Sequence, residues 1–453
     1  MPACHATANP FPRVIILIIY LLSILHSDVF AADNRSFFSL SEVIAYALKN
    51  NPGIRQSGNA RDIEQLNIQI AKAERMPRVD LNSGITRFRY PTAVTPITGS
   101  PLAGAGFPEF DTSIYDIGLS FRMPLFRGGR LERWIDISGI RASISEDMLT
   151  INRQELIYNL TSVYFRISLL EKLLSVTEAT VKQMEEHRGN VELFLKAGTV
   201  PGVELLKTDL ELARAQQNAL LVRNTLETAY ELLKTLMGLE NINNDISLVT
   251  GATLGNNTLS YEEAVSRALA QRPDYLAVVK KKKLAEARIK YAGGKRLPDV
   301  FLMGEYTDRS GEGLEFRENW NLALRLTMPV FDGGSIKTDI VKEKKEREKI
   351  MEEEKALRLT VIREIKEAFI QSQNAKQRMA VSLKAIETAK ENLRIESLKF
   401  RTGSNTSTDV LDAQSVLLQV ESDSCQALYD NEMATAALMK AMGEDTCCRE
   451  VTP

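Results

Sequence analysis

The chain has little of the chemistry on which enzymes depend. Its 453 residues include three histidines and four cysteines, and His187 is the only histidine beyond residue 26. Apart from Cys4, the cysteines are Cys425, Cys447 and Cys448, and an odd number with two adjacent is a poor disulfide framework. No nucleophile–base pair and no set of metal ligands can be assembled from these residues. We therefore expect no enzyme, no catalytic residue, no cofactor and no metal site.

Long apolar runs and an excess of charge are also missing. The one clear apolar run, Val14–Leu25, has about 12 residues, which suits a signal peptide and is too short for a transmembrane helix. Small residues at Val29-Phe30-Ala31 favour cleavage before Ala32, so residues 1–31 are expected to be an export signal; an uncleaved anchor is the alternative. The formal net charge of −2 provides no basic surface for nucleic acid.

What the chain does contain is a long internal repeat. Met123–Gly129 reads Met-Pro-Leu-Phe-Arg-Gly-Gly and returns about 205 residues later as Met328–Gly334, Met-Pro-Val-Phe-Asp-Gly-Gly. An upstream match between 47–52 and 268–273 has an offset of about 221, so roughly 16 residues are inserted in the first copy. Each copy is too long for a solenoid unit and must be a substantial substructure. We expect the motif to form strand-to-helix turns at Pro124, Gly128, Gly129, Pro329, Gly333 and Gly334.

A seven-residue apolar period predicts very long helices. One column between Gly129 and Gly198 is Leu156, Val163, Leu170, Met184 and Val191, interrupted at Thr177. Heptads sustained over this length favour a helix of roughly 100 Å supercoiled against partner helices. We predict long helices over about 130–197 and 335–402, with return helices over about 202–237 and 408–442. Shorter entering helices, about 53–75 and 274–292, run parallel to the return helices and can stack end to end with them.

Strict alternation predicts a pair of strands ahead of each long helix. Tyr115, Ile117 and Leu119 alternate with polar residues in the first half, and Trp320 and Leu322 do so in the second. We predict strand pairs over about 79–90 with 114–123 and 299–307 with 319–328, joined by loops at 91–113 and 308–317. The pattern suits strands between lipid and a watery lumen, although a soluble hairpin on a core would look the same. Four transmembrane strands cannot close a barrel, so such a protein must oligomerise, and three chains would supply about twelve strands.

The sequence resembles the TolC family of outer-membrane efflux channels over nearly the whole mature chain. The most specific segment is Phe400–Gln414, which looks like an aromatic-x-x-Gly turn followed by Asp-Val-Leu-Asp-Ala, and the Met-Pro-x-Phe-x-Gly-Gly motifs add to it. The resemblance implies a mostly α fold with β structure: two tandem repeats, 32–258 and 259–445, and a tail, 446–453. Each repeat would be a long helical hairpin plus two transmembrane strands. A trimer would form a twelve-stranded β-barrel continued by a periplasmic α-helical barrel, with an equatorial region around it.

The resemblance also implies a gate at the periplasmic tip. Family aspartates that match Asp409 and Asp412 face the lumen there, Glu204 and Lys207 stand at the equivalent positions of the first hairpin, and Phe400 and Asn405 replace the latch tyrosine and arginine of the best-known member. The alternative role of the acids is helix capping, because Ser407 or Thr408 can cap the returning helix and first-turn acids suit its dipole.

These features lead us to expect a passive exit duct in the outer membrane that extends into the periplasm. The expected partners are two further copies of the chain, outer-membrane lipid, a periplasmic adaptor and an inner-membrane transporter of the RND or ABC type, with no nucleic acid. The adaptor is expected at the hairpin turns, formed by Gly198, Thr199, Val200, Gly403 and Ser404. The sequence does not select between efflux and type I secretion, or among substrates. The competing interpretation is a periplasmic adaptor or a structural coiled coil.

Overall fold

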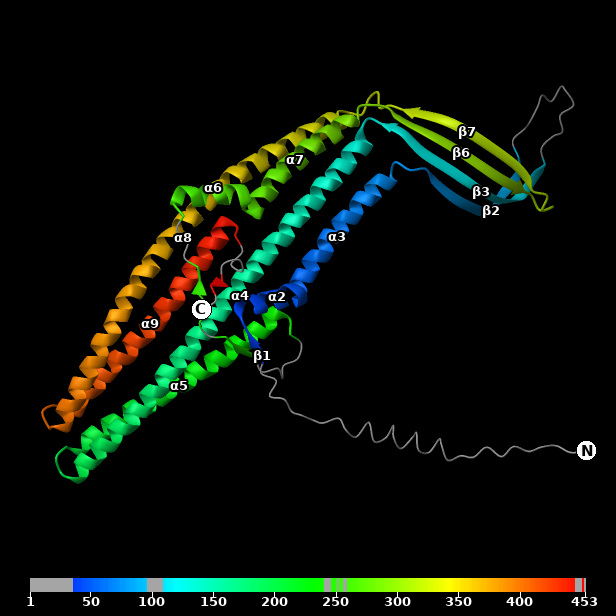
Figure 1. Cartoon of the computed structure of the whole chain (residues 1–453). Helices are drawn as coiled ribbons and strands as arrows, with labels where there is room; N and C mark the ends of the chain where they lie inside the picture. Colours follow the sequence, from blue (N-terminus) through cyan, green and yellow to red (C-terminus); the bar gives the residue numbers. More distant parts are fainter. Residues whose placement is uncertain are drawn as a thin grey trace, which may run out of the picture.

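The structure is a computed structural model that describes residues 36–95, 109–239, 246–249, 251, 253–255, 259–444 and 450–451. The expected signal peptide, 1–31, and most of the expected tail lie outside the described residues. The molecule is elongated: long helices carry a β-sheet at one end, and the turns of two helical hairpins form the other end (Figure 1). None of the described helices combines the length and the apolar character needed to cross a bilayer.

Four pairs of helices have equal lengths in the two halves of the chain. Helices α2 and α6 have 11 residues each, α3 and α7 have 22, α4 and α8 have 67, and α5 and α9 have 36. Their bounds are α2 Leu40–Asn50, α3 Pro52–Ala73, α4 Arg130–Lys196, α5 Gly202–Met237, α6 Tyr261–Gln271, α7 Pro273–Gly294, α8 Ser335–Arg401 and α9 Ser407–Met442. The two 67-residue helices are each about 100 Å long.

Two shorter helices lie end to end along each long helix. Along α4, α3 occupies the part nearer the sheet and α5 the part nearer the turn (Figure 1). At their junction the amide of Asn51 donates to the carbonyl of Leu236 (2.8 Å), while its side-chain oxygen caps α3 through the N–H of Gly53 (2.8 Å). Helices α7 and α9 share α8 in the same way, and Arg272 links them by donating to the carbonyl of Ala441 (3.3 Å).

The apolar column of α4 forms the core of this arrangement. Leu156, Val163, Leu170, Met184 and Val191 are all buried. The interruption at Thr177 is buried too, because its hydroxyl donates to the carbonyl of Leu174 within the same helix (2.9 Å). A buried polar group whose hydrogen bond is satisfied costs little, so the heptad continues through this position.

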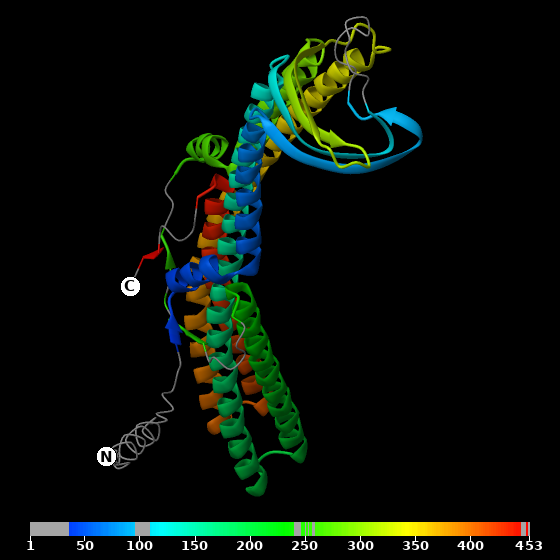
Figure 2. The ribbon, with the colours of Figure 1, turned by 90° about the vertical axis from the view of Figure 1, so that its right-hand side faces the viewer.

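Several short elements pack on one side of the long helices, near the middle of the rod. Strand β1, Ser36–Phe38, pairs in parallel with β4, Ile246–Leu248, and β5, Thr253–Leu254, pairs antiparallel with β8, Glu450–Val451. Helices α2 and α6 both begin with a Ser-x-x-Glu capping box, and α2 packs its apolar side on α4 and α5. Figure 2 shows these elements on one side of the long helices. The N-terminal, inter-repeat and C-terminal segments therefore meet in one region.

The sheet contains four antiparallel strands in the order β2-β3-β6-β7. Their bounds are β2 Arg78–Ala93, β3 Phe110–Arg127, β6 Asp299–Ser310 and β7 Arg317–Thr327. The predicted loops at 91–113 and 308–317 were too long, because the strands continue to Ala93 and from Phe110, and the second loop spans only 311–316. The longer first loop, 94–109, includes 96–108, which lie outside the described residues.

Pro124 was wrongly assigned to a strand-to-helix turn. It lies within β3, where it faces Phe301 of β6, and the register shifts between Pro124 and Phe126. A proline inside a sheet is tolerated at such an irregularity because its missing N–H breaks no regular ladder bond. The turn itself comes later, at Gly128 and Gly129, which have φ angles of 61° and 74°.

The strand register separates the sheet into an apolar face and a polar face. Leu81 lies opposite Leu119, Leu119 opposite Tyr306, and Tyr306 opposite Trp320. The apolar face consists of Val79, Leu81, Ile85, Tyr115, Ile117, Leu119, Phe121, Met123, Val300, Leu302, Tyr306, Trp320, Leu322, Leu324 and Leu326. Leu81 and Leu324 are 70% and 68% exposed. A patch of this extent marks a surface that contacts lipid or another protein.

Gly128 also sits where two backbones approach closely. A Cβ atom added there would lie 2.2 Å from the carbonyl oxygen of Gly294 at the end of α7, whereas one added at the equivalent Gly333 would meet nothing within 4 Å. Both glycines have positive φ angles, 61° and 66°. Glycine is therefore required at position 128 both by the close approach of Gly294 and by the positive φ angle, and at position 333 by the positive φ angle alone.

We expect Gly128→Ala to lower thermal stability clearly more than Gly333→Ala. Both variants carry the left-handed backbone cost of about 1–2 kcal/mol, and only Gly128→Ala must also separate the end of α7 from the turn. The measurement is the midpoint of thermal unfolding of the purified protein by circular dichroism. Equal shifts for the two variants would show that the close approach at Gly128 contributes nothing.

Candidate functional site

Two equivalent turns form the end of the rod opposite the sheet (Figure 1). Gly198 ends the α4 turn with φ 71° and Gly403 ends the α8 turn with φ 74°. In the first, the N–H of Thr199 donates to the carbonyl of Phe194 (3.0 Å), and in the second the N–H of Ser404 donates to that of Lys399 (2.8 Å). Both turns are Schellman motifs, which end a helix with a glycine in the left-handed region.

The returning helices begin differently in the two turns. Helix α5 follows Pro201 and has no side-chain cap, whereas α9 has a complete capping box. Thr406 is the cap: its hydroxyl accepts from the N–H of Asp409 (3.3 Å), and the Asp409 carboxylate accepts from the N–H of Thr406 (2.8 Å). The expectation that Ser407 or Thr408 is the cap was therefore wrong. The hydrogen bonds from Thr406, through its side chain and then its backbone, lower the pKa of Asp409.

Polar contacts join the first hairpin to the start of α9, and we call them the seam. The ring Nε2 of His187 lies 2.8 Å from the hydroxyl of Ser407, which also lies 3.4 Å from the hydroxyl of Thr208. Lys207 donates to the hydroxyl of Thr408 (3.3 Å). Helices α4 and α5 thus both hold the first turn of α9.

An aromatic cluster lies directly behind the seam. Phe400 is 5% exposed, and its ring centroid lies 5.1 Å from that of His187 and 5.4 Å from that of Phe194. Val191 and Val410 are buried in the same cluster, which receives residues from both hairpins. Phe400, expected near the gate, thus packs inside the tip and joins the hairpins by apolar contact rather than by a polar latch.

The expected gate acids occupy two different places in one chain. Glu204, with a side chain 13% exposed, accepts from Lys207 (3.2 Å) beside the seam. Asp409 and Asp412 are exposed and line a groove between α8 and α9. Asn405 borders the same groove and donates to the carboxylate of Glu396 (2.6 Å). Asp409, Asp412 and Asn405 thus share this groove, whereas Glu204 and Lys207 lie beside the seam and do not line it.

The expected docking turns are mostly accessible. Gly198, Thr199, Gly403 and Ser404 are exposed, whereas Val200 is half-buried against the aromatic cluster. The expected turn residues Pro329, Gly333 and Gly334 lie between β7 and α8, where Gly334 precedes the first residue of the helix with φ 86°.

His187 is the site residue that sequence reasoning missed. It lies three residues after Met184 and four before Val191, both in the buried column of α4, and that spacing was the available signal. Burial lowers the pKa of His187 to about 4, and the nearby Glu204 carboxylate opposes the shift only in part. The ring is therefore neutral at ordinary pH.

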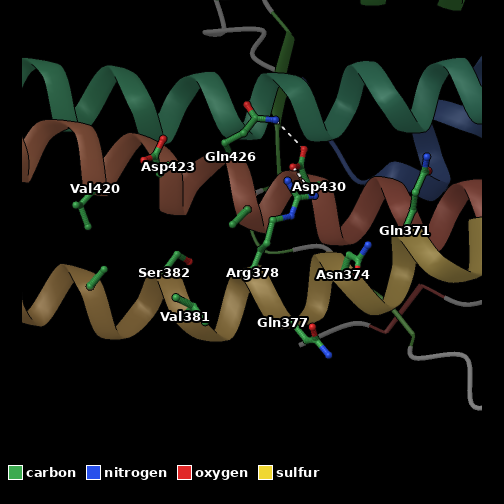
Figure 3. A pocket seen from close by; sticks show the side chains of 12 residues that line it. Gln371, Asn374, Gln377, Arg378, Val381, Ser382, Val420, Asp423, Gln426 and Asp430 are labelled. Carbon is green, nitrogen blue, oxygen red and sulfur yellow. Dashed lines mark hydrogen bonds and ion pairs between the residues drawn. The ribbon is translucent and has the colours of Figure 1, made fainter.

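A second groove lies farther along α8 and α9 and has a volume of about 750 Å³ (Figure 3). Amides and small side chains line most of it. Asp430 accepts from Gln426 (2.8 Å) and pairs with Arg378 across the groove (3.1 Å). The groove is thus bounded by polar side chains of both α8 and α9.

Comparisons with known proteins agree on one family. A family model described as "Outer membrane efflux protein" matches residues 43–239 and 264–444. The chain is 22% identical over 413 residues to the outer membrane efflux protein BepC of Brucella suis, covering 90% of this chain and 86% of BepC. It is 22% identical over 419 residues to the outer membrane protein OprJ of Pseudomonas aeruginosa, covering 89% of this chain and 84% of OprJ.

Solved structures share the fold. The Campylobacter jejuni CmeC outer membrane channel has a TM-score of 0.78 at 17% identity, covering 100% of this chain and 94% of that chain. The outer membrane protein VceC from Vibrio cholerae has a TM-score of 0.74 at 16% identity, covering 90% of this chain and 96% of that chain. The mostly helical fold with a small sheet is thus that of TolC-like channels.

We expect the seam to weaken in acid through His187. Its pKa is about 4 in the folded chain against 6.5 ordinarily, so the unfolded chain binds the extra proton first as pH falls. The contribution of the neutral His187 ring to the free energy of unfolding is complete above pH 6.5 and is lost as the pH falls from 6.5 to 4. The loss is on the order of 2 kcal/mol after allowance for solvent screening.

Denaturant unfolding at pH 7 and pH 4.5 measures this effect. His187→Phe keeps an aromatic ring against Phe400 and removes the titration, so it should lose less stability than the parent between the two pH values. The control is Ser407→Ala, which removes the hydrogen bond but leaves the ring to titrate. An unchanged pH dependence in His187→Phe would contradict the assignment.

Proposed function

The chain belongs to the outer membrane efflux protein family, and on that premise we propose that three copies form one continuous duct across the outer membrane and the periplasm. Membership makes it an outer-membrane channel component of an efflux system; the family is one of transport components and not of enzymes. The observation that carries the proposal is the four-stranded sheet with one exposed apolar face and two unpaired edge strands, β2 and β7.

Those edges give the trimer a definite geometry. The four strands alternate in direction, so β7 of one chain runs antiparallel to β2 of a neighbouring chain. Joining them repeats the same ladder, and three chains of four strands make an all-antiparallel barrel of twelve. Closure satisfies the backbone groups of every edge, which hydrocarbon cannot do. The apolar face then contacts lipid and the polar face lines the lumen.

The helices would continue this barrel into the periplasm. Each chain contributes two long helices with two shorter ones stacked along each, and a ring of three chains places these layers around one axis. The sides of α8 and α9 around the 750 Å³ groove are available to a neighbouring copy or to a partner. A periplasmic adaptor or coiled-coil rod surrounded by water would not expose a large apolar sheet face, so the exposed face favours the duct.

We place the gate at the hairpin tips. The seam and the aromatic cluster around Phe400 hold the two hairpins of one chain together, and they take the place of the polar latch expected from the family. Asp409 and Asp412 are exposed on α9, so three chains would bring six carboxylates near the axis. Glu204 is paired with Lys207 and adds little net charge.

The partners follow from what a duct lacks. It has no energy source of its own, so a periplasmic adaptor would dock at the turns around Gly198 and Gly403 and an inner-membrane transporter of the RND or ABC type would drive export. Relatives in Pseudomonas putida carry names such as solvent efflux pump outer membrane protein, which supports a pump as the assembly in which this chain acts.

Charge on the apolar face should prevent assembly. Leu119→Arg and Leu324→Arg place a guanidinium in lipid and should each cost about 2–4 kcal/mol near mid-bilayer, whereas Ser120→Arg points into the lumen and should be tolerated. The measurement is the yield of heat-modifiable trimer in outer-membrane fractions. Equal yields for the three variants would refute the proposed facing, and a purely soluble parent would refute the channel.

The carboxylates of α9 should make the tip a cation site. Trivalent hexaamminecobalt added to the periplasmic side should block single-channel current in planar bilayers, because closely spaced carboxylates favour bound cations. Asp409→Asn with Asp412→Asn should remove most of the block, whereas Glu204→Gln should change it little, since Lys207 already neutralises Glu204. Hydrogen bonds from Thr406 lower the pKa of Asp409. The contribution of Asp409 to the block should therefore persist until the pH falls below the ordinary pKa of an aspartate.

A double variant that assembles and is blocked as tightly as the parent would leave Asp409 with the capping role alone. Its capping box with Thr406 is already sufficient to account for the residue.

A further inference from the structure

Arginines gather on the polar face of the sheet where it joins the helices. Arg122 of β3 has its guanidinium carbon 4.7 Å from the ring centroid of Phe301, and that of Arg127 lies 5.8 Å from the same centroid. Arg325 of β7 is the direct cross-strand partner of Phe301. Directly opposed residues on one face have Cβ atoms about 4.5–5.5 Å apart. The ring of Phe301 thus contacts two guanidinium groups of β3, and Arg325 of β7 is its cross-strand neighbour.

The carboxylates nearby are already engaged. Asp299 pairs with Arg127 (3.9 Å) and also binds Arg130. One step farther from the helices, Asp80 pairs with Arg78 (2.9 Å). Glu305, on the same row as Asp80, accepts from Thr307 (3.2 Å) and Asn321 (3.4 Å).

Arg122 and Arg325 take no part in these ion pairs. Within the described part of the chain, neither has a hydrogen bond to a carboxylate or an ion pair, and both are exposed. Arg122 also stands directly opposite Arg78 in the ladder, an arrangement of like charges that destabilises a sheet. The cluster thus offers several N–H donors that the chain itself does not use.

We propose that Arg122, held over the ring of Phe301, and Arg325, the cross-strand neighbour of Phe301 on β7, form a binding site for carboxylate groups of small organic anions passing through the barrel. The proposal rests on the proposed function, because only a closed trimer makes the polar face a lumen. Guanidinium groups bind carboxylates through two parallel hydrogen bonds, and stacking on an aromatic ring holds such a group in a fixed orientation. Three copies would form a cationic girdle at the helix-side end of the barrel.

The girdle and the tip then carry opposite charge. Cationic solutes are retained by Asp409 and Asp412 at the tip, whereas anionic groups are bound by Arg122 and Arg325 in the barrel. The acids Asp80 and Glu305 on the next row disfavour anions farther along. The site is therefore a local binding step and does not make the whole pore anion-selective.

The test is block of single-channel current by benzene-1,3,5-tricarboxylate added to the barrel side of trimers in planar bilayers. We expect concentration-dependent block of the parent, weakened about ten-fold or more in Arg122→Gln with Arg325→Gln, since each lost charge-assisted bond is large on this scale. Arg78→Gln is the matched control and should change the block less than about two-fold, because Asp80 already neutralises Arg78. Arg122→Lys, which keeps the charge and loses the fork, should give an intermediate value.

The outcomes separate this inference from the proposed function. A parent without any channel overturns the duct itself, and a conducting parent that the tricarboxylate does not block overturns the girdle alone. Equal block of parent and double variant also overturns the girdle. Heat-modifiable trimer is scored first, and if the double variant does not assemble, the single variants Arg122→Gln and Arg325→Gln take its place with a weakening of several-fold expected from each.

Discussion

The backbone N–H and C=O groups at the edges of β2 and β7 need hydrogen-bond partners, and the rest of the structure depends on this requirement. Each edge presents a row of N–H and C=O groups, and in the proposed bilayer setting hydrocarbon leaves no water to satisfy those groups. Neighbouring copies can supply the partners only if each chain offers the same two edges at the same height and inclination. The sheet must therefore be held rigidly on the helices, and the close approach of Gly128 to Gly294 provides such a hold.

Rigidity along the rod comes from the matching of helix lengths. Helices α3 and α5 together cover α4, and α7 and α9 cover α8, so each long helix is packed over most of its length. The junctions are fixed by polar side chains, Asn51 in one half and Arg272 in the other, which donate to carbonyls at the end of the opposing helix. A helix about 100 Å long would bend easily if it stood alone. Packed in this way, it can transmit a constraint from the sheet to the tip.

Much of this architecture could be read from the sequence because its signals are periodic and long. Heptads located the long helices, and strict alternation located the strands, but the strand ends were misplaced because loop composition near Pro91 outweighed the ladder bonds that continue past it. Pro124 was misjudged because a register shift cannot be read from one strand alone. The cap at Thr406 was missed although Thr406-x-x-Asp409 carries the capping-box spacing, since three adjacent hydroxyl residues competed for the role.

The separation of Glu204 from Asp409 illustrates a limit of repeat-based reasoning. Equivalent positions share backbone geometry, as the paired φ angles of Gly198 and Gly403 demonstrate, but not partners. Helix α9 is stabilised within its own hairpin by Thr406 and Asp409, whereas α5 begins after Pro201 without a side-chain cap. The start of α5 therefore depends on contacts across the seam, where Lys207 reaches Thr408 and Thr208 lies beside Ser407. Loss of the seam frees the first hairpin more than the second, so movement at the tip is expected to begin with α5 while α9 keeps its carboxylates in place.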